Sequence, residues 1–196
     1  MAGRVLVRGV GINDASYPVA RYGVVNGRPK QVWLCRIYQT WGHMLSRCYS
    51  TATQKRQPTY VGCSVSPEWL TFSNFHSWMS AQDWRGKNLD KDILFPGNRI
   101  YGPDFCLLIP QDLNKFVLDS AASRGDLPIG VINFRHGRFR ADCQNPWGNK
   151  AYIGIFHSAS QAHEAWRRKK HEYALRYAEM QTDQRIADAL RKRYLA

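Results

Sequence analysis

Residues 130–144, with the sequence GVINFRHGRFRADCQ, decide the fold of the C-terminal part of this chain. A β-strand points successive side chains to opposite faces. From residue 138 onward the apolar side chains Phe139, Ala141 and Cys143 therefore share one face, which can pack on a core. The other face carries polar side chains: Arg138, Arg140, Asp142 and Gln144.

Strand-like segments at residues 130–134 and 151–156 flank this strand, with turn residues between them. Ser158 is a helix-cap residue, and the pattern after it predicts a helix through about Met180. Residues 128–182 are thus predicted to form a three-stranded antiparallel sheet packed on a helix, and residues 183–196 a final amphipathic helix. On the third strand the alternation turns Ile153 and Ile155 towards that helix. The opposite face then carries Lys150, Tyr152 and Gly154.

Segment 129–182 resembles the APETALA/ethylene-response-factor DNA-binding domain. The matching residues are Gly130-Val131, Gly137-Arg138-Phe139-Arg140-Ala141, Tyr152-Ile153-Gly154-Ile155-Phe156 and Ala162-His163-Glu164-Ala165-Trp166. The resemblance implies that the sheet lies in the major groove of double-stranded DNA, with candidate contacts at His136, Arg138, Arg140, Gln144, Lys150 and Tyr152. The family's first-strand arginines fall on Ile129, Ile132 and Phe134, so a base preference does not carry over.

The charge of the whole chain also favours a polyanionic partner. Lys and Arg number 28 against 15 acidic residues, which gives a formal net charge of +13. A membrane partner is not expected, because no apolar run of membrane-spanning length exists and residues 1–10 lack the apolar core of a signal peptide. We expect a cytoplasmic protein, in a bacterial host cell if the chain is phage-derived.

The rest of the chain is predicted to be α+β as well. Residues 1–30 are rich in Gly, Asn and Pro and are expected to form an irregular N-terminal arm, with short strands as the alternative. Apolar spacing predicts helices over residues 31–49 and from Pro67 to about Ser80, with a polar, turn-rich segment at 50–66. A strand (88–94), a turn (95–104), a strand (105–109) and a helix (111–120) follow. They complete a domain at residues 31–122, and residues 123–128 are the expected linker.

The pattern of strand, turn, strand and helix over residues 88–120 resembles the ββα core of phage HNH homing endonucleases. The residues that carry this resemblance are Leu89-Asp90-Lys91-Asp92, Gly97-Asn98, Tyr101-Gly102-Pro103-Asp104, Cys106, Pro110 and Asn114, together with residues 41–49 and Glu68-Trp69. An acid on the first strand and an amide on the helix can hold one divalent cation against a phosphate, and nucleases use that cation to stabilise developing charge. The resemblance assigns Mg²⁺ binding to Asp90 and Asn114.

The resemblance to the HNH endonucleases is incomplete at the family's catalytic positions. Lys91 stands where the family has its general-base histidine, and Phe105 stands at the family's central asparagine. The candidate catalytic residues are Asp90, Lys91, Asp92 and Asn114. Lysine can act as a base only with a strongly lowered pKa, and neighbouring carboxylates oppose that change.

Five cysteines without a C-x-x-C pair predict reduced, mostly buried thiols rather than disulfides or a zinc site. The leading hypothesis is a DNA-binding protein of the HNH homing-endonuclease type, with Mg²⁺-dependent cutting or nicking if it cleaves. One alternative is a catalytically inactive DNA-binding regulator or accessory protein on the same frame. Another is an RNA-binding module, which the narrow major groove of A-form RNA disfavours for a sheet reader.

Overall fold

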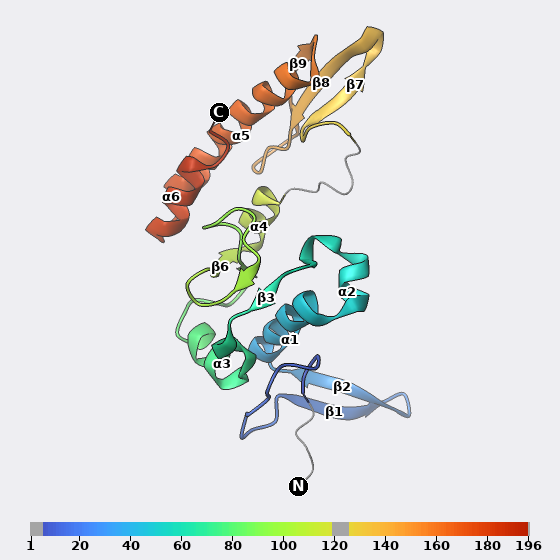
Figure 1. The fold of residues 1–196 in the computed structure, drawn as a ribbon, viewed down its shortest axis with the longest axis vertical. Helices are drawn as coiled ribbons and strands as arrows, with labels where there is room; N and C mark the ends of the chain where they lie inside the picture. Colours follow the sequence, from blue (N-terminus) through green and yellow to red (C-terminus); the bar gives the residue numbers. More distant parts are fainter. Residues whose placement is uncertain (1–5, 119–125, 196) are drawn as a thin grey trace. The chain divides into compact units, whose positions relative to one another are not determined.

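The computed structural model describes residues 6–118 and 126–195, and the chain divides into two compact units, Met1–Ile109 and Pro110–Ala196 (Figure 1). Both units mix helix and sheet, in keeping with the expected α+β class. The first five residues of the expected arm, residues 119–122 and linker residues 123–125 lie outside the described residues. In the described part of the chain, no helix has the length and apolar character that crossing a membrane requires.

The first unit contains an antiparallel hairpin of strands β1 (Ala20–Val25) and β2 (Arg28–Leu34). Asn26 and Gly27 join the strands with φ values of 52° and 72°, as a two-residue hairpin turn requires. The expectation of a helix from residue 31 is therefore wrong over 31–34, which form strand. Val32 and Trp33 are strong strand formers; Trp33 pairs with Arg21 of β1, and Val32 is the extra residue at a register shift between the strands.

The core of the first unit is built by helices α1 (Arg36–Tyr49) and α3 (Phe72–Ser80) with the short helix η2 (Pro67–Leu70). The indole of Trp41 is fully buried and its Nε1 donates to the carbonyl of Trp69 at 2.7 Å. Residues 50–66, expected to be polar and turn-rich, contain helix α2 (Thr51–Arg56), η1 (Pro58–Tyr60) and strand β3 (Ser64–Val65). Ser50 supplies the cap of α2, since its side chain accepts from the amide of Thr53.

Two small sheets complete this unit. Strand β3 pairs in parallel with β5 (Ile100–Tyr101), and β4 (Lys87–Asp90) pairs with β6 (Leu107–Pro110). The expected strand 88–94 ends early, at Asp90. The Asp90 carboxylate turns the chain there by accepting from the amides of Asp92 and Ile93, at 2.9 and 2.7 Å.

The second unit contains helix α4 (Gln111–Val117), strands β7 (Val131–Phe134), β8 (Arg138–Cys143) and β9 (Ala151–Phe156), and helices α5 (Ala159–Glu179) and α6 (Gln184–Lys192). The strands form one antiparallel sheet in the order β7-β8-β9. Ser158 caps α5, because its Oγ accepts from the amide of Gln161 at 3.2 Å. The predicted three-stranded sheet followed by a capped helix is confirmed.

Candidate nucleic-acid interface

One face of the β7–β9 sheet packs on helix α5. The other face exposes side chains to solvent. As predicted, Phe139, Ala141 and Cys143 lie on the packed face, and Ala141 and Cys143 are completely buried. Val131 and Ile153 add to the same core. Arg138 and Arg140 alternate with these residues along β8 and therefore belong to the outer face.

Asp142 holds two cations of the outer face in place. Its carboxylate accepts from Arg140 at 3.0 Å (Nε) and 2.9 Å (Nη2), and Lys150 Nζ lies 3.4 Å away. The Arg140 guanidinium also lies 5.2 Å from the ring centroid of Tyr152. Asp142 was expected among the exposed side chains of this face, which is wrong, because its side chain is only 5% exposed. Burial of the acid leaves Arg140 fixed in orientation and still 39% exposed.

Apolar side chains surround this arginine. The strand register places Ile132 of β7 directly opposite Arg140 and Phe134 opposite Arg138, while Ile155 of β9 pairs with Arg140 from the other side. All three apolar side chains are exposed on the sheet surface. The outer face therefore combines guanidinium groups with uncovered hydrocarbon.

A bulge in the β8–β9 pairing explains why Ile155 is exposed. Ala141 pairs with Gly154 and Asp142 with Tyr152, so Ile153 is an extra residue on β9. The prediction that Ile155 faces the helix and Gly154 faces outward is therefore wrong. An extra residue reverses the alternation beyond it, and the neighbouring Gly154 was the available signal, since a glycine inside a strand often marks a bulge.

The six predicted contact residues follow the length of the sheet. Arg138, Arg140 and Tyr152 lie on its outer face, and the Tyr152 ring is exposed. His136 lies in the β7–β8 turn with a left-handed φ of 55°. Gln144 and Lys150, both exposed, lie at the other end, where β8 finishes and β9 begins.

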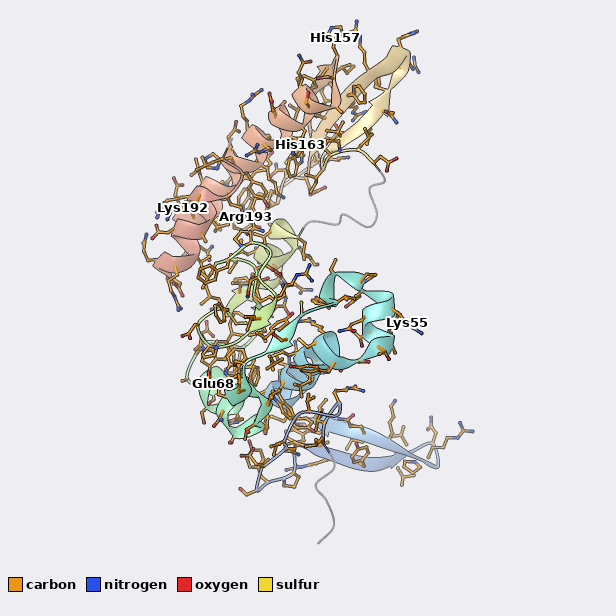
Figure 2. The ribbon with its side chains drawn as sticks, viewed as in Figure 1. Lys55, Glu68, His157, His163, Lys192 and Arg193 are labelled. Carbon is orange, nitrogen blue, oxygen red and sulfur yellow. The ribbon has the colours of Figure 1, made fainter. Side chains whose placement is uncertain are left out.

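The start of β7 is fixed to helix α5 by close packing. Gly130 has a φ of +82°, and a Cβ there would lie 2.0 Å from Cδ1 of Trp166. His163 stacks on Trp166 with the ring centroids 5.5 Å apart, and its Nδ1 lies 2.9 Å from the carbonyl oxygen of Ile129. Gly130 and Trp166 thus fix the start of the sheet to α5. Figure 2 labels His163 on α5.

The basic run 167–170 on α5 divides between surface and interior. Arg168 is exposed, whereas Lys170 is buried with its Nζ 3.7 Å from the centroid of the Phe116 ring. Burial lowers the pKa of Lys170 to about 8. Lys170 is therefore a core residue of the second unit and is not placed to contact phosphate.

The second predicted site, Asp90-Lys91-Asp92, forms a closed turn after β4. Lys91 is buried, and its Nζ donates to both carboxylate oxygens of Asp92 at 2.8 Å and to the carbonyl of Asn98. A second hydrogen bond joins the same two residues, because Asn98 Nδ2 donates to the carbonyl of Lys91 at 3.0 Å. Lys91 Nζ is therefore engaged as a hydrogen-bond donor to Asp92 and Asn98.

Asn114, the fourth candidate catalytic residue, lies half-buried on α4 in the second unit, whereas Asp90 belongs to the first. Asp90 and Asp92 both hold the turn with their carboxylates, so a cation bound there would replace an internal hydrogen bond. Among the described residues, no group of three or more His, Cys, Asp and Glu side chains is gathered as for a metal ion.

All five cysteines are free, and four of them are buried, as predicted. Burial raises the pKa values of Cys48 and Cys106 to about 12, so both are thiols at neutral pH.

Comparison with known proteins gave no match to a family model, to a curated protein or to a solved structure.

Two features of the outer face of the β7–β9 sheet were not predicted from the sequence. The first is the exposure of Ile132 and Phe134, although both stand on β7 at alternate positions and so share a face. The second is the role of Asp142 in positioning Arg140 and Lys150. The spacing of Arg140 and Asp142, two residues apart on one strand, was the available signal for the second.

Proposed function

We propose that this chain binds duplex DNA through the outer face of the β7–β9 sheet. The observation that carries the proposal is the fixed guanidinium of Arg140, which Asp142 binds and Tyr152 stacks against. A guanidinium held in one orientation loses little side-chain entropy on binding and presents its remaining donors to a partner. Guanidinium donors on a rigid sheet suit the acceptors of guanine in the major groove.

The apolar members of the face support duplex DNA as the partner. Ile132 and Ile155 flank Arg140, and apolar side chains can contact the thymine methyl group, which also lies in the major groove. A strand of six residues spans roughly 20 Å, enough to cross a groove about 12 Å wide. The major groove of A-form RNA is too narrow for such a sheet, so RNA is the weaker candidate.

The test is binding of the purified chain to duplexes selected from a random library, with titrations at several salt concentrations. Arg138→Ala and Arg140→Ala should weaken binding, and each phosphate contact that is lost should reduce the salt slope by about 0.9. Arg191→Ala is the matched control, because this exposed arginine on α6 pairs with Asp188, three residues before it on the same helix. Equal affinity of wild type, Arg138→Ala and Arg140→Ala at every salt concentration would remove the sheet from the interface.

Metal-dependent DNA cleavage, of the phage HNH homing-endonuclease type, is a second candidate. What favours it is the chain order: Asp90 ends β4, β6 pairs with β4, and α4 with Asn114 directly follows β6. The engaged state of Lys91 favours the inactive regulator or accessory protein instead.

Incubation with supercoiled plasmid distinguishes these two candidates. A nuclease should nick the plasmid in Mg²⁺ or Mn²⁺ and not in chelator, whereas an inactive regulator should nick it in neither. The informative variant is Asp90→Asn, because its amide oxygen can still accept from the turn amides while the carboxylate charge is lost. Metal-dependent nicking that Asp90→Asn abolishes would support a nuclease. Binding without nicking would support the regulator.

A further inference from the structure

The hairpin β1–β2 stands outside the core of the first unit. None of the buried or partly buried hydrophobic residues of that core comes from residues 20–34, although Val19 and Cys35 on either side belong to it. The hairpin exposes large apolar side chains, with Tyr22 73% and Val24 76% accessible. Figure 1 shows the two strands extending beyond helices α1 and α3 of the same unit. A hairpin that buries so little of itself stabilises the fold weakly, which favours another role.

The strand register gathers the hairpin's three cations on one face. Residues directly opposite each other in an antiparallel pair point the same way, and alternate residues of a strand share a face. Arg21, Gly23 and Val25 alternate along β1 and lie opposite Trp33, Lys30 and Arg28 respectively. This arrangement defines a cationic face of Arg21, Arg28 and Lys30, next to the Trp33 ring, whose centroid is 5.4 Å from the Arg21 guanidinium.

The surrounding sequence has the same sign of charge. Between Asp14 and Glu68 the chain contains no acidic residue and seven basic ones. Lys55 and Arg56, on helix α2, are exposed like the cations of the hairpin, and Figure 2 shows Lys55 pointing away from that helix. A second copy of this hairpin would bring like charges together, so the charge favours a polyanion over self-association.

We propose that β1–β2 is a second DNA-binding element, a two-stranded ribbon that lies against duplex DNA with its cationic face. The inference rests on the proposed function and adds a contact made by the first unit. A two-stranded β-ribbon fits the major groove of B-DNA. Arg28 and Lys30 bind phosphate, Arg21 is held by Trp33, and Val25, which shares the face with Arg28, meets the groove wall. The chain then binds DNA with both of its units, and its site is longer than one sheet can cover.

The test compares two double variants in the full chain, Arg28→Ala/Lys30→Ala on the ribbon and Arg138→Ala/Arg140→Ala on the sheet. Affinity for selected duplexes is measured by fluorescence anisotropy from 50 to 300 mM NaCl, values chosen to span the range in which phosphate contacts are screened. The ribbon variant should weaken binding about tenfold and reduce the salt slope by about 1.8. It should also shorten the region of DNA protected from hydroxyl radicals.

Arg85→Ala/Lys87→Ala is the matched control, because it removes the same charge from the same unit near Asp83. All three ribbon cations are exposed, so the ribbon variant should unfold at the same temperature as the wild type. An unchanged unfolding temperature also confirms that the variant is folded.

The outcomes separate this inference from the proposed function. Loss of binding in the sheet variant alone overturns the ribbon and leaves the proposed function standing. Loss in the ribbon variant alone overturns the sheet interface and supports the ribbon. Equal loss in the ribbon variant and its control overturns the ribbon, because charge alone would explain it. Wild-type protein that binds no duplex overturns both.

Discussion

Lys170 places its Nζ 3.7 Å from the centroid of the Phe116 ring, so that an ammonium group lies in the aromatic core of the second unit. Trp166 and Tyr194 are the next rings, at 5.9 and 5.8 Å. Burial lowers the pKa of Lys170 to about 8, an effect that Cys143 opposes and Arg193 reinforces. The aromatic faces offset part of the cost of burying the charge.

The first prediction is a rise in stability with pH that depends on Lys170. The folded pKa lies below the unfolded value of 10.5, so the unfolded chain binds more protons between about pH 8 and 10.5. The free energy of unfolding should therefore rise through that window, by at most about 3 kcal/mol relative to Lys170→Met. Urea unfolding from pH 7 to 10.5 measures it. Lys115→Met, at an exposed lysine, is the control, and parallel curves for wild type and Lys170→Met would contradict the prediction.

The second prediction concerns Gly130. Alanine there would meet the Trp166 indole at 2.0 Å and would keep a left-handed φ, so Gly130→Ala should cost about 2–4 kcal/mol. Gly137→Ala is the matched change, because Gly137 has a φ of +69° with no atom within 4 Å of its built Cβ. It should cost only about 1 kcal/mol. Thermal unfolding of both variants decides the point, and equal costs would show that the indole can move aside.

The third prediction concerns Asp142. Asp142→Asn keeps the shape of the side chain but removes the charge that holds Arg140 and Lys150. Because both cations are partly exposed, the variant should lose about 1–2 kcal/mol of stability, less than a fully buried pair would lose. Affinity for unselected DNA should rise, while the ratio of selected to unselected affinity should fall. An unchanged ratio would mean that the orientation of Arg140 carries no sequence information.

The fourth prediction separates the structural role of Asp90 from any catalytic one. Asp90→Ala leaves the amides of Asp92 and Ile93 without their acceptor and should destabilise the first unit by about 1–2 kcal/mol. Asp90→Asn keeps an acceptor oxygen and should cost less. Hydrogen exchange at residues 91–93 reports the opening of this turn directly. Faster exchange in both variants alike would show that the charge of Asp90, and not its geometry, holds the turn.

The second unit was predicted well because its signals are local. Alternation along residues 138–143 determined which side chains of β8 meet the helix, and Ser158 marked the start of α5. The bulge at Ile153 was not predicted, because Gly154 beside it is a bulge signal but the position of the extra residue depends on the match between two strands.

The first unit was predicted less well. The Asn26-Gly27 pair between strand-forming residues was a hairpin signal, yet the many glycines and prolines nearby favoured an irregular arm. Lys91 shows a different limit. Its partners Asp92 and Asn98 are close in sequence, but only the folded turn brings the Asn98 carbonyl to the ammonium.

The separation of the β1–β2 ribbon from the core has a consequence for how this protein can change over time. Substitutions at exposed positions away from core packing usually alter stability by less than about 0.5 kcal/mol. The ribbon's face can therefore accept new side chains at little risk to folding, whereas the β7–β9 face shares its strands with the packing on α5. If both elements touch DNA, the ribbon is the part on which a new target preference can arise most readily.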